Sequence, residues 1–138
     1  MLDMIERLKS VADFDRSLTN ANLILFAFAA WSGPSHKSRG VVTDAFAQLR
    51  RSAPTLNISI VEIDVTEQSG DIWDRVTAWL TDQNNVDPTS YMYSGAGSVA
   101  WVRDGNVVDS IVNAHHTGTG GFVDRSVHAF PDRIQDGG

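Results

Sequence analysis

The sequence predicts an α/β fold, a three-layer α/β/α sandwich with a central mixed sheet of four or five strands. Three observations support this prediction. Residues 23–30 form an unbroken apolar run, as expected of a strand covered on both faces at the centre of a sheet. Helical and strand patterns alternate along the chain, which is typical of helices layered on a sheet. Asp104-Gly105 stands between two apolar stretches and predicts an antiparallel hairpin, so the sheet should be mixed.

The first half of the chain is predicted to supply a helix, a strand, a second helix and a second strand. An N-terminal helix is expected over residues 1–13, where four apolar residues recur at helical spacing: Leu2, Ile5, Leu8 and Val11. The apolar strand then ends at a turn, Trp31-Ser-Gly-Pro-Ser35. The helix that follows should end before Pro54, because proline disfavours helical backbone in the residue before it. Residues 56–65, rich in Ile and Val, are predicted as the next strand.

The second half is predicted to close the fold with a helix, a hairpin and a last helix. Helical spacing of apolar residues indicates the first of these helices: Ile72, Val76, Trp79 and Leu80. Residues 83–90 are polar and are predicted to form a loop. The hairpin strands are expected at 98–102 and 106–112, and residues 118–121 as a flexible bend. The closing helix is predicted from a final apolar set: Phe122, Val123, Val127 and Phe130.

Length and composition limit the classes of function. With 138 residues the chain is predicted to form one domain over 1–138, ending in a polar tail at 131–138. A net charge of −6 argues against nucleic-acid and anionic-membrane partners, which require a positive surface. The longest apolar run is far shorter than the roughly 20 residues of a membrane span, so a cytoplasmic location is expected. The sequence contains no cysteine, which excludes disulfides, thiol catalysis and cysteine-ligated zinc.

Two segments resemble the thioredoxin family. Residues 23–37 are similar to its signature, an apolar strand followed by Trp-Cys-Gly-Pro-Cys-Lys at the start of a helix. Three residues match this motif: Trp31, Gly33 and Pro34. Serine stands at both cysteine positions, as Ser32 and Ser35. Residues 95–108 resemble a second landmark of the family, a Gly-x-Pro-Thr stretch that leads into a strand and hairpin. The resemblance covers residues 14–130 and implies the thioredoxin fold.

The resemblance also implies a chemistry that this chain lacks. In the family, a cysteine at a helix N-terminus is stabilised as a thiolate, attacks a disulfide, and is released by the second cysteine. A serine hydroxyl is a far weaker acid and cannot exchange with sulfur. We therefore expect no catalytic residue in the chain as written, and we expect Ser32 and Ser35 to cap the helix, since serine is a preferred N-cap.

Three further positions depart from the family pattern. Phe26 stands where thioredoxins carry a buried acid, Gly40 where a proline kinks the helix, and Gly97 where a cis-proline faces the dithiol. These departures favour a naturally redox-inactive protein. The alternative is a thiol-disulfide oxidoreductase of the thioredoxin or bacilliredoxin type in an inactive Cys-to-Ser form. Without proline, we expect a trans peptide bond between Ala96 and Gly97, because a cis bond there would cost about 2.5–4 kcal/mol.

The sequence predicts a binding function in place of catalysis. Trp31 is expected on the surface beside the serine turn, where a large aromatic side chain can anchor a partner. The predicted binding residues surround it: Trp31, Gly33, Pro34, Ala96 and Gly97. The expected partner is a protein or peptide, in the role of an adaptor, assembly factor or chaperone-like protein, and no cofactor is expected. An anion or small-thiol site at the serine helix is a weaker hypothesis, because the cis-proline is missing.

Two other groups of residues are interpreted as structural. His115 and His116 are expected on a surface loop, pointing in opposite directions as neighbours in an extended segment do, so no metal site is predicted. Three tryptophans lie at core-facing or strand positions and are expected to pack in the interior: Trp73, Trp79 and Trp101.

Overall fold

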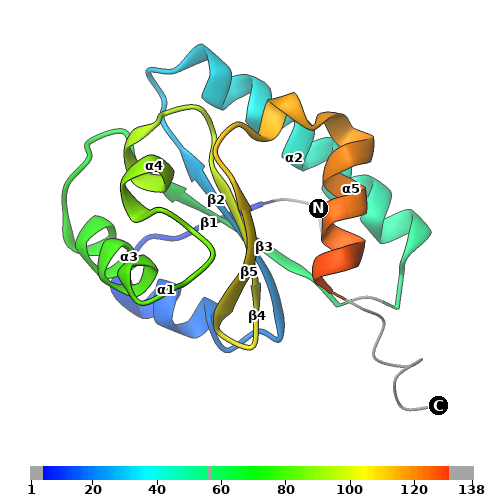
Figure 1. The fold of residues 1–138 in the computed structure, drawn as a ribbon, viewed down its shortest axis with the longest axis horizontal. Helices are drawn as coiled ribbons and strands as arrows, with labels where there is room; N and C mark the ends of the chain where they lie inside the picture. The colour runs from blue at the N-terminus through cyan, green and yellow to red at the C-terminus, as the bar shows by residue number, and fades with distance from the viewer. Residues whose placement is uncertain (1–4, 56, 131–138) are drawn as a thin grey trace.

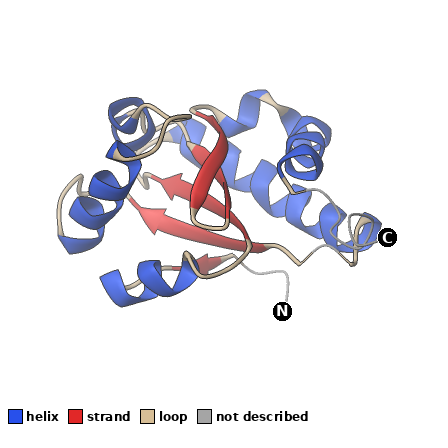
Figure 2. Ribbon diagram, turned by 60° about the horizontal axis from the view of Figure 1, so that its bottom comes forward, coloured by secondary structure: helices blue, strands red, loops and turns tan. Residues whose placement is uncertain are grey.

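A computed structural model describes residues 5–55 and 57–130, and the predicted tail at 131–138 lies outside this range. It contains a five-stranded mixed sheet with helices on both faces, which confirms the predicted fold class (Figures 1 and 2). The elements in chain order are β1 (Glu6–Arg7), α1 (Val11–Ser17), β2 (Asn22–Phe28), α2 (Gly33–Ser52), β3 (Ser59–Asp64), α3 (Asp71–Thr81), α4 (Pro88–Tyr93), β4 (Val99–Arg103), β5 (Asn106–Ile111), the short 3₁₀ helix η1 (Ala114–His116) and α5 (Gly118–Ala129).

The apolar strand lies at the centre of the sheet, as predicted. The strand order is β1-β3-β2-β4-β5, and every residue of β2 is buried. Leu25 pairs with Val61 of β3 in a parallel register and with Ala100 of β4 in an antiparallel register. A strand hydrogen-bonded on both edges and covered on both faces can be apolar throughout, which explains the absence of polar alternation.

The hairpin between β4 and β5 confirms the prediction made from Asp104-Gly105. Both turn residues have positive φ, 52° at Asp104 and 85° at Gly105, which is the backbone form that a two-residue turn between right-twisted strands needs. β5 is then antiparallel to β4, with an irregularity in register between Trp101 and Val102. The hairpin supplies the antiparallel part of the sheet.

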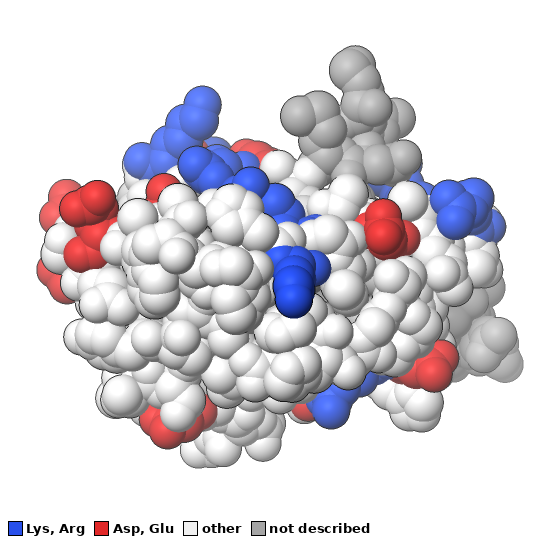
Figure 3. Space-filling view, turned by 90° about the horizontal axis from the view of Figure 1, so that it is seen from above, with Lys and Arg blue, Asp and Glu red and all other residues white. Residues whose placement is uncertain are grey.

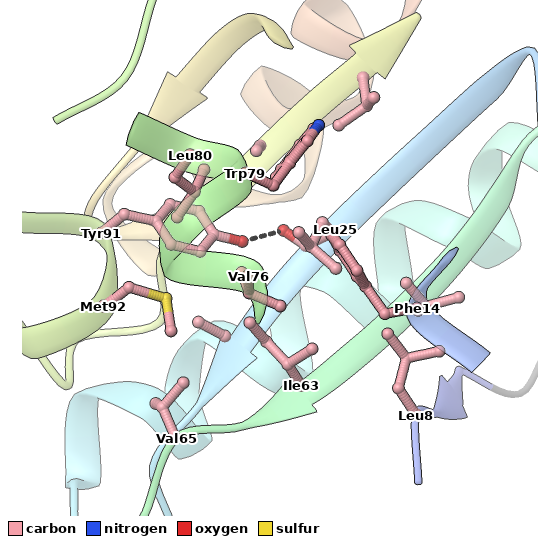
Figure 4. Close-up of a cluster of buried hydrophobic side chains, with 14 of the residues drawn as sticks. Leu8, Phe14, Leu25, Ile63, Val65, Val76, Trp79, Leu80, Tyr91 and Met92 are labelled. Carbon is pink, nitrogen blue, oxygen red and sulfur yellow. Dashed lines mark hydrogen bonds between the residues drawn. The ribbon is translucent and has the colours of Figure 1, made fainter. Parts of the chain in front are cut away.

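Two apolar cores lie on opposite faces of the sheet. Helices α1, α3 and α4 cover one face, and α2 and α5 cover the other (Figure 1). In the first core the Tyr91 hydroxyl donates a hydrogen bond of 2.6 Å to the Leu25 carbonyl oxygen (Figure 4). Burial raises the pKa of this phenol well above its ordinary value, so Tyr91 serves as a neutral donor that fixes α4 to the central strand.

The predicted N-terminal helix over 1–13 is wrong within the described residues. Glu6 and Arg7 form a short strand parallel to β3, and the first helix begins only at Val11, with Ser10 as its N-cap. The Arg7 guanidinium binds the buried carboxylate of Glu62 at 2.6 Å, and the Leu8 amide donates to the Glu62 carbonyl oxygen. Pairing with an available sheet edge therefore determines the structure here, in spite of the helical spacing of the apolar residues.

Two predicted loops are also partly wrong. Residues 83–90 include the start of α4, where the Asp87 side chain accepts the amide of Thr89 and Pro88 occupies the first helical turn. Residues 118–121 are not a bend but the first turn of α5. Short or glycine-rich helical turns carry little apolar periodicity, so the sequence pattern does not reveal them. In the described part of the chain, no helix has both the length and the apolar character needed to cross a bilayer.

Candidate functional site

The serine turn lies where β2 ends and α2 begins. Ser32 has extended backbone (φ −107°, ψ 121°), and its Oγ accepts the amide of Ser35 at 3.3 Å. Pro34 stands in the first helical turn, where a missing amide hydrogen costs no intrahelical hydrogen bond. Ser32 is thus the N-cap of α2, in agreement with its predicted role.

Ser35 has a different role from the predicted one. Its side chain is fully buried, and its Oγ accepts the backbone N–H of Ala29 at 2.9 Å. This bond satisfies an amide at the end of the central strand that has no partner in the sheet ladder. Ser32 is also buried, at 7% exposed. Both hydroxyls therefore face the protein interior and are engaged within the chain.

Trp31 is the exposed residue of the turn. Its side chain is 58% exposed, while its indole Nε1 donates to the carbonyl oxygen of Thr66 at 3.2 Å. The ring lies against Gly95: a Cβ at that glycine would be 2.3 Å from Cη2 of Trp31. The indole is therefore held in one orientation between the β3–α3 loop and the Gly95 loop, with much of its face open to solvent.

The loop from Ser94 to Ser98 has glycine-dependent geometry. φ is +67° at Gly95 and +91° at Gly97, values that favour glycine. A Cβ at Gly97 would lie 2.3 Å from Cβ of Ser38, so α2 approaches the loop more closely than any larger residue would permit. The Ala96–Gly97 peptide bond is trans, as predicted, since there is no cis bond in the described residues.

Ser38 joins this loop to the segment before α5. Its buried Oγ donates to the Ala96 carbonyl oxygen at 2.8 Å and accepts the backbone N–H of His115 at 3.0 Å. Nδ1 of His115 lies 3.0 Å from the same Oγ. Because the hydroxyl has one proton and gives it to Ala96, we assign the imidazole proton to Nδ1, so that a second proton would be added at Nε2.

The backbone of Ala96 is fully used within the chain. Its N–H donates to Ser94 Oγ at 3.3 Å, and its carbonyl oxygen accepts from Ser38. The next carbonyl, that of Gly97, accepts the amide of Ala114 at 3.1 Å. A peptide that accepts a hydrogen bond from the Ala96 N–H would have to displace the Ser94 hydroxyl, so the site favours contact through side chains.

The two adjacent histidines do not lie on an extended segment, in contrast to the prediction. They belong to η1, and their rings meet edge to face with centroids 4.2 Å apart. Burial lowers the pKa of His115 from its ordinary value, and the positive charges of His116 and Lys37 lower it further. Within the described ranges, no group of three or more His, Asp or Glu side chains could hold a metal ion.

The remaining aromatic residues divide into buried and exposed sets. As predicted, three tryptophans are buried: Trp73, Trp79 and Trp101. Tyr93, which the sequence analysis did not single out, is 52% exposed and meets Trp73 edge to face at 4.9 Å. It precedes Gly95 by two residues, so it stands near the loop on which the Trp31 ring lies. It is the last residue of α4, a short helix that the sequence pattern did not predict, and for this reason the sequence analysis missed it.

A separate cleft of about 420 Å³ lies at the opposite end of the sheet. Its lining includes Arg16, Asn20 and Asn57, none of which belongs to the serine turn or to the Gly95 loop. The residues singled out from the sequence are thus gathered at one end of the sheet, away from this cleft.

Comparison with known proteins connects this architecture to solved structures alone. No family model matches the chain, and no curated protein does. Thioredoxin from Trypanosoma brucei brucei matches over 98% of this chain and 95% of its own, with a TM-score of 0.61 at 11% identity. A mutant thioredoxin from Halobacterium salinarum NRC-1 covers 93% and 92%, with a TM-score of 0.62 at 15% identity. The chain has the thioredoxin fold. A putative oxidoreductase with a thioredoxin fold also matches, with a TM-score of 0.63 at 9% identity over 87% of this chain and 91% of its own.

Within the thioredoxin fold, the departures noted in the sequence lie around one region. Phe26 is completely buried on the α2 face of the sheet, so no carboxylate is available there to accept a proton. Gly40 lies inside α2, and a Cβ added to it would meet no atom within 4 Å. Gly97 touches Ser38 where the resemblance implies a proline. The site thus keeps the fold's arrangement of turn and loop but not the groups that dithiol chemistry requires.

Proposed function

We propose that this chain is a redox-inactive thioredoxin-fold protein that acts by binding a protein or peptide through the face around Trp31. One observation carries the proposal: Trp31 is 58% exposed, whereas the two serines beside it are buried and hydrogen-bonded within the chain. A large, fixed aromatic side chain open to solvent is the kind of residue that anchors an interface. Gly33 and Pro34 stand beside it, both exposed.

The internal bonds of the Gly95 loop limit how a partner can bind. Ala96 has no free backbone hydrogen-bonding group, so in this proposal the loop contributes a surface rather than a strand edge. Tyr93, two residues before Gly95 in the chain, is a second exposed aromatic side chain. A role as an adaptor, assembly factor or chaperone-like protein in the cytoplasm is consistent with such a surface and needs no cofactor, nucleic acid or membrane.

Site-specific photo-crosslinking tests the proposal. A benzophenone amino acid is placed at position 33, because Gly33 is exposed beside Trp31 and an added Cβ there would meet no atom within 4 Å. The matched control is position 127, because Val127 is also exposed, at 47%, but lies on α5. In cells of the native source, we expect one defined partner to be crosslinked from position 33 and not from position 127. Equal crosslinking from both positions, or none from either, would contradict the proposal.

The second candidate is a thiol-disulfide oxidoreductase in an inactive Cys-to-Ser form. The observation in its favour is that Trp31, Gly33 and Pro34 match the family motif around two one-atom replacements. The native gene sequence at positions 32 and 35 separates this candidate from the first, and so does the activity of a cysteine-restored variant.

A further inference from the structure

Three basic residues lie beside the proposed binding face. Lys37 is exposed on the first turns of α2, and His115 and His116 stack on each other in η1. Ser38 joins the two elements through its contacts with the His115 backbone and ring at 3.0 Å. Lys37 directly precedes Ser38 in α2, and its positive charge is one of the causes that lower the pKa of His115. The three groups therefore form one cluster, named here the basic rim.

Within residues 5–55 and 57–130, the basic rim has no acidic partner. Among the described residues, no ion pair joins Lys37, His115 or His116 to an acid, although the chain as a whole has a net charge of −6. Figure 3 looks onto the end of the molecule where α2 begins. A Lys or Arg side chain lies near the middle of that face among residues that are mostly neither basic nor acidic, and most of the Asp and Glu lie nearer its edges. An acidic protein thus presents a local surface on which the Lys37 charge and the N–H groups of two histidines are complementary to an anion.

We propose that the basic rim binds the carboxylate side chains of an acidic segment in the partner, while Trp31 and Tyr93 contact apolar residues of the same segment. The inference rests on the proposed function and specifies the chemistry of its partner. Trp31 and Tyr93 supply contact area without charge selectivity. The basic rim supplies the discrimination, because complementary charges favour one partner and like charges reject others.

The imidazole of His115 makes this recognition dependent on pH. Nδ1 of His115 carries a proton bonded to Ser38, so a second proton would be added at Nε2. The charges facing His115 are Lys37 on α2 and His116 on η1, and both oppose that protonation. A bound carboxylate favours it. Binding should therefore strengthen as pH falls from about 8 to about 5.5, a range in which the carboxylates of the partner stay ionised.

Selection from a random peptide library displayed on phage, at about pH 5.5 and about pH 7.5, is the first test. We expect the selected peptides to combine an aromatic or aliphatic residue with Asp or Glu, and to fail to bind W31A. Peptides that require Trp31 but show no enrichment of Asp or Glu would overturn the proposed role of the basic rim and leave the proposed peptide-binding function standing. Recovery of no specific peptide at either pH would overturn the proposed peptide-binding function itself.

Affinity measurements on the most enriched peptide provide the second test. The binding affinity of this acidic peptide, labelled with fluorescein, is compared with that of a labelled amide peptide, in which Asp and Glu are replaced by Asn and Gln. K37Q, H115N and H116Q should each weaken binding of the acidic peptide by about two- to fivefold at the lower pH and leave the amide peptide unaffected. H115N keeps a donor towards Ser38, and H128Q is the control, because His128 is exposed on α5 outside the rim. Equal effects on both peptides, or a loss with H128Q, would overturn the inference.

Discussion

Among single residues, Ser38 has the largest influence on the shape of the site. Its one hydroxyl contacts Ala96 in the loop before β4 and His115 in η1, which are 58 and 77 residues away in the sequence. The close contact with Ser38 leaves no room for a Cβ at Gly97. Three segments are therefore positioned by one buried polar atom.

S38A should destabilise the protein by about 1–3 kcal/mol, because the Ala96 carbonyl oxygen and the His115 amide both lose their partner. Urea denaturation followed by circular dichroism measures the change. S52A is the matched control, since Ser52 also bonds a carbonyl oxygen within α2 but is exposed, and it should alter stability very little. Equal stability of S38A and the unmodified protein would show that the loop is held by other contacts.

His115 should titrate below the ordinary histidine value. Burial and two positive neighbours lower its pKa in the folded state, so the unfolded chain binds the proton more readily. Its contribution to stability is then fully present above about pH 6.5 and declines as pH falls from there through the folded-state pKa. NMR titration of the imidazole signals, assigned by comparison with H115N, gives the midpoint. A midpoint above the ordinary value of about 6.5 would contradict the described surroundings of the ring.

Among the secondary-structure elements, α2 combines a functional N-terminus with an ordinary amphipathic body. Its buried face includes Ser35 and Ser38 near the start and then Val42, Phe46 and Leu49. The polar residues near the start contact the loops, and the apolar residues pack on the sheet. Gly40 lies between these two parts on the exposed side of the helix.

G40A should stabilise the protein by about 0.5–1 kcal/mol. Alanine is the better helix former, and a Cβ at position 40 would meet no other atom within 4 Å. Thermal unfolding should show a higher midpoint. G97A offers the opposite case, because it would place a Cβ 2.3 Å from Ser38 on backbone with φ of +91°, and it should be clearly destabilising. A G40A protein less stable than the parent would mean that α2 needs flexibility at this point.

Over the whole molecule, the thioredoxin fold is kept while its dithiol chemistry is absent. The sheet order, the two cores and the turn at α2 all fit that fold. The chain contains no cysteine, and Phe26 replaces the buried acid with an apolar ring. The end of the molecule that carries the serine turn thus has the thioredoxin fold but lacks thiol groups.

Restoring both cysteines should therefore recover little activity. We expect S32C/S35C to reduce insulin with dithiothreitol only slightly faster than S32A/S35A, for two reasons. No carboxylate at Phe26 can accept a proton, and the backbone groups of Ala96 are occupied. The unmodified chain should show no rate above the uncatalysed background. Activity of the restored variant comparable to that of a thioredoxin would favour the Cys-to-Ser alternative.

Local sequence patterns were sufficient to predict the fold class, the central strand, the hairpin and the helix N-cap at Ser32. Each depends on a short-range signal: an apolar run, a turn dipeptide, and a serine before proline at the start of a helix. Thiol chemistry could also be excluded from the sequence, since that conclusion needs only the absence of cysteine. The exposure of Trp31 was predicted through the resemblance and agrees with the structure.

The other features depend on contacts between distant parts of the chain. Glu6–Arg7 forms a strand because the edge of β3 and the buried Glu62 are available to it. Ser38 and His115 meet because the fold brings together segments 77 residues apart, and no local pattern encodes such a contact. Helical and strand preferences are properties of neighbouring residues, whereas edge pairing and buried hydrogen bonds depend on what the rest of the chain places opposite them.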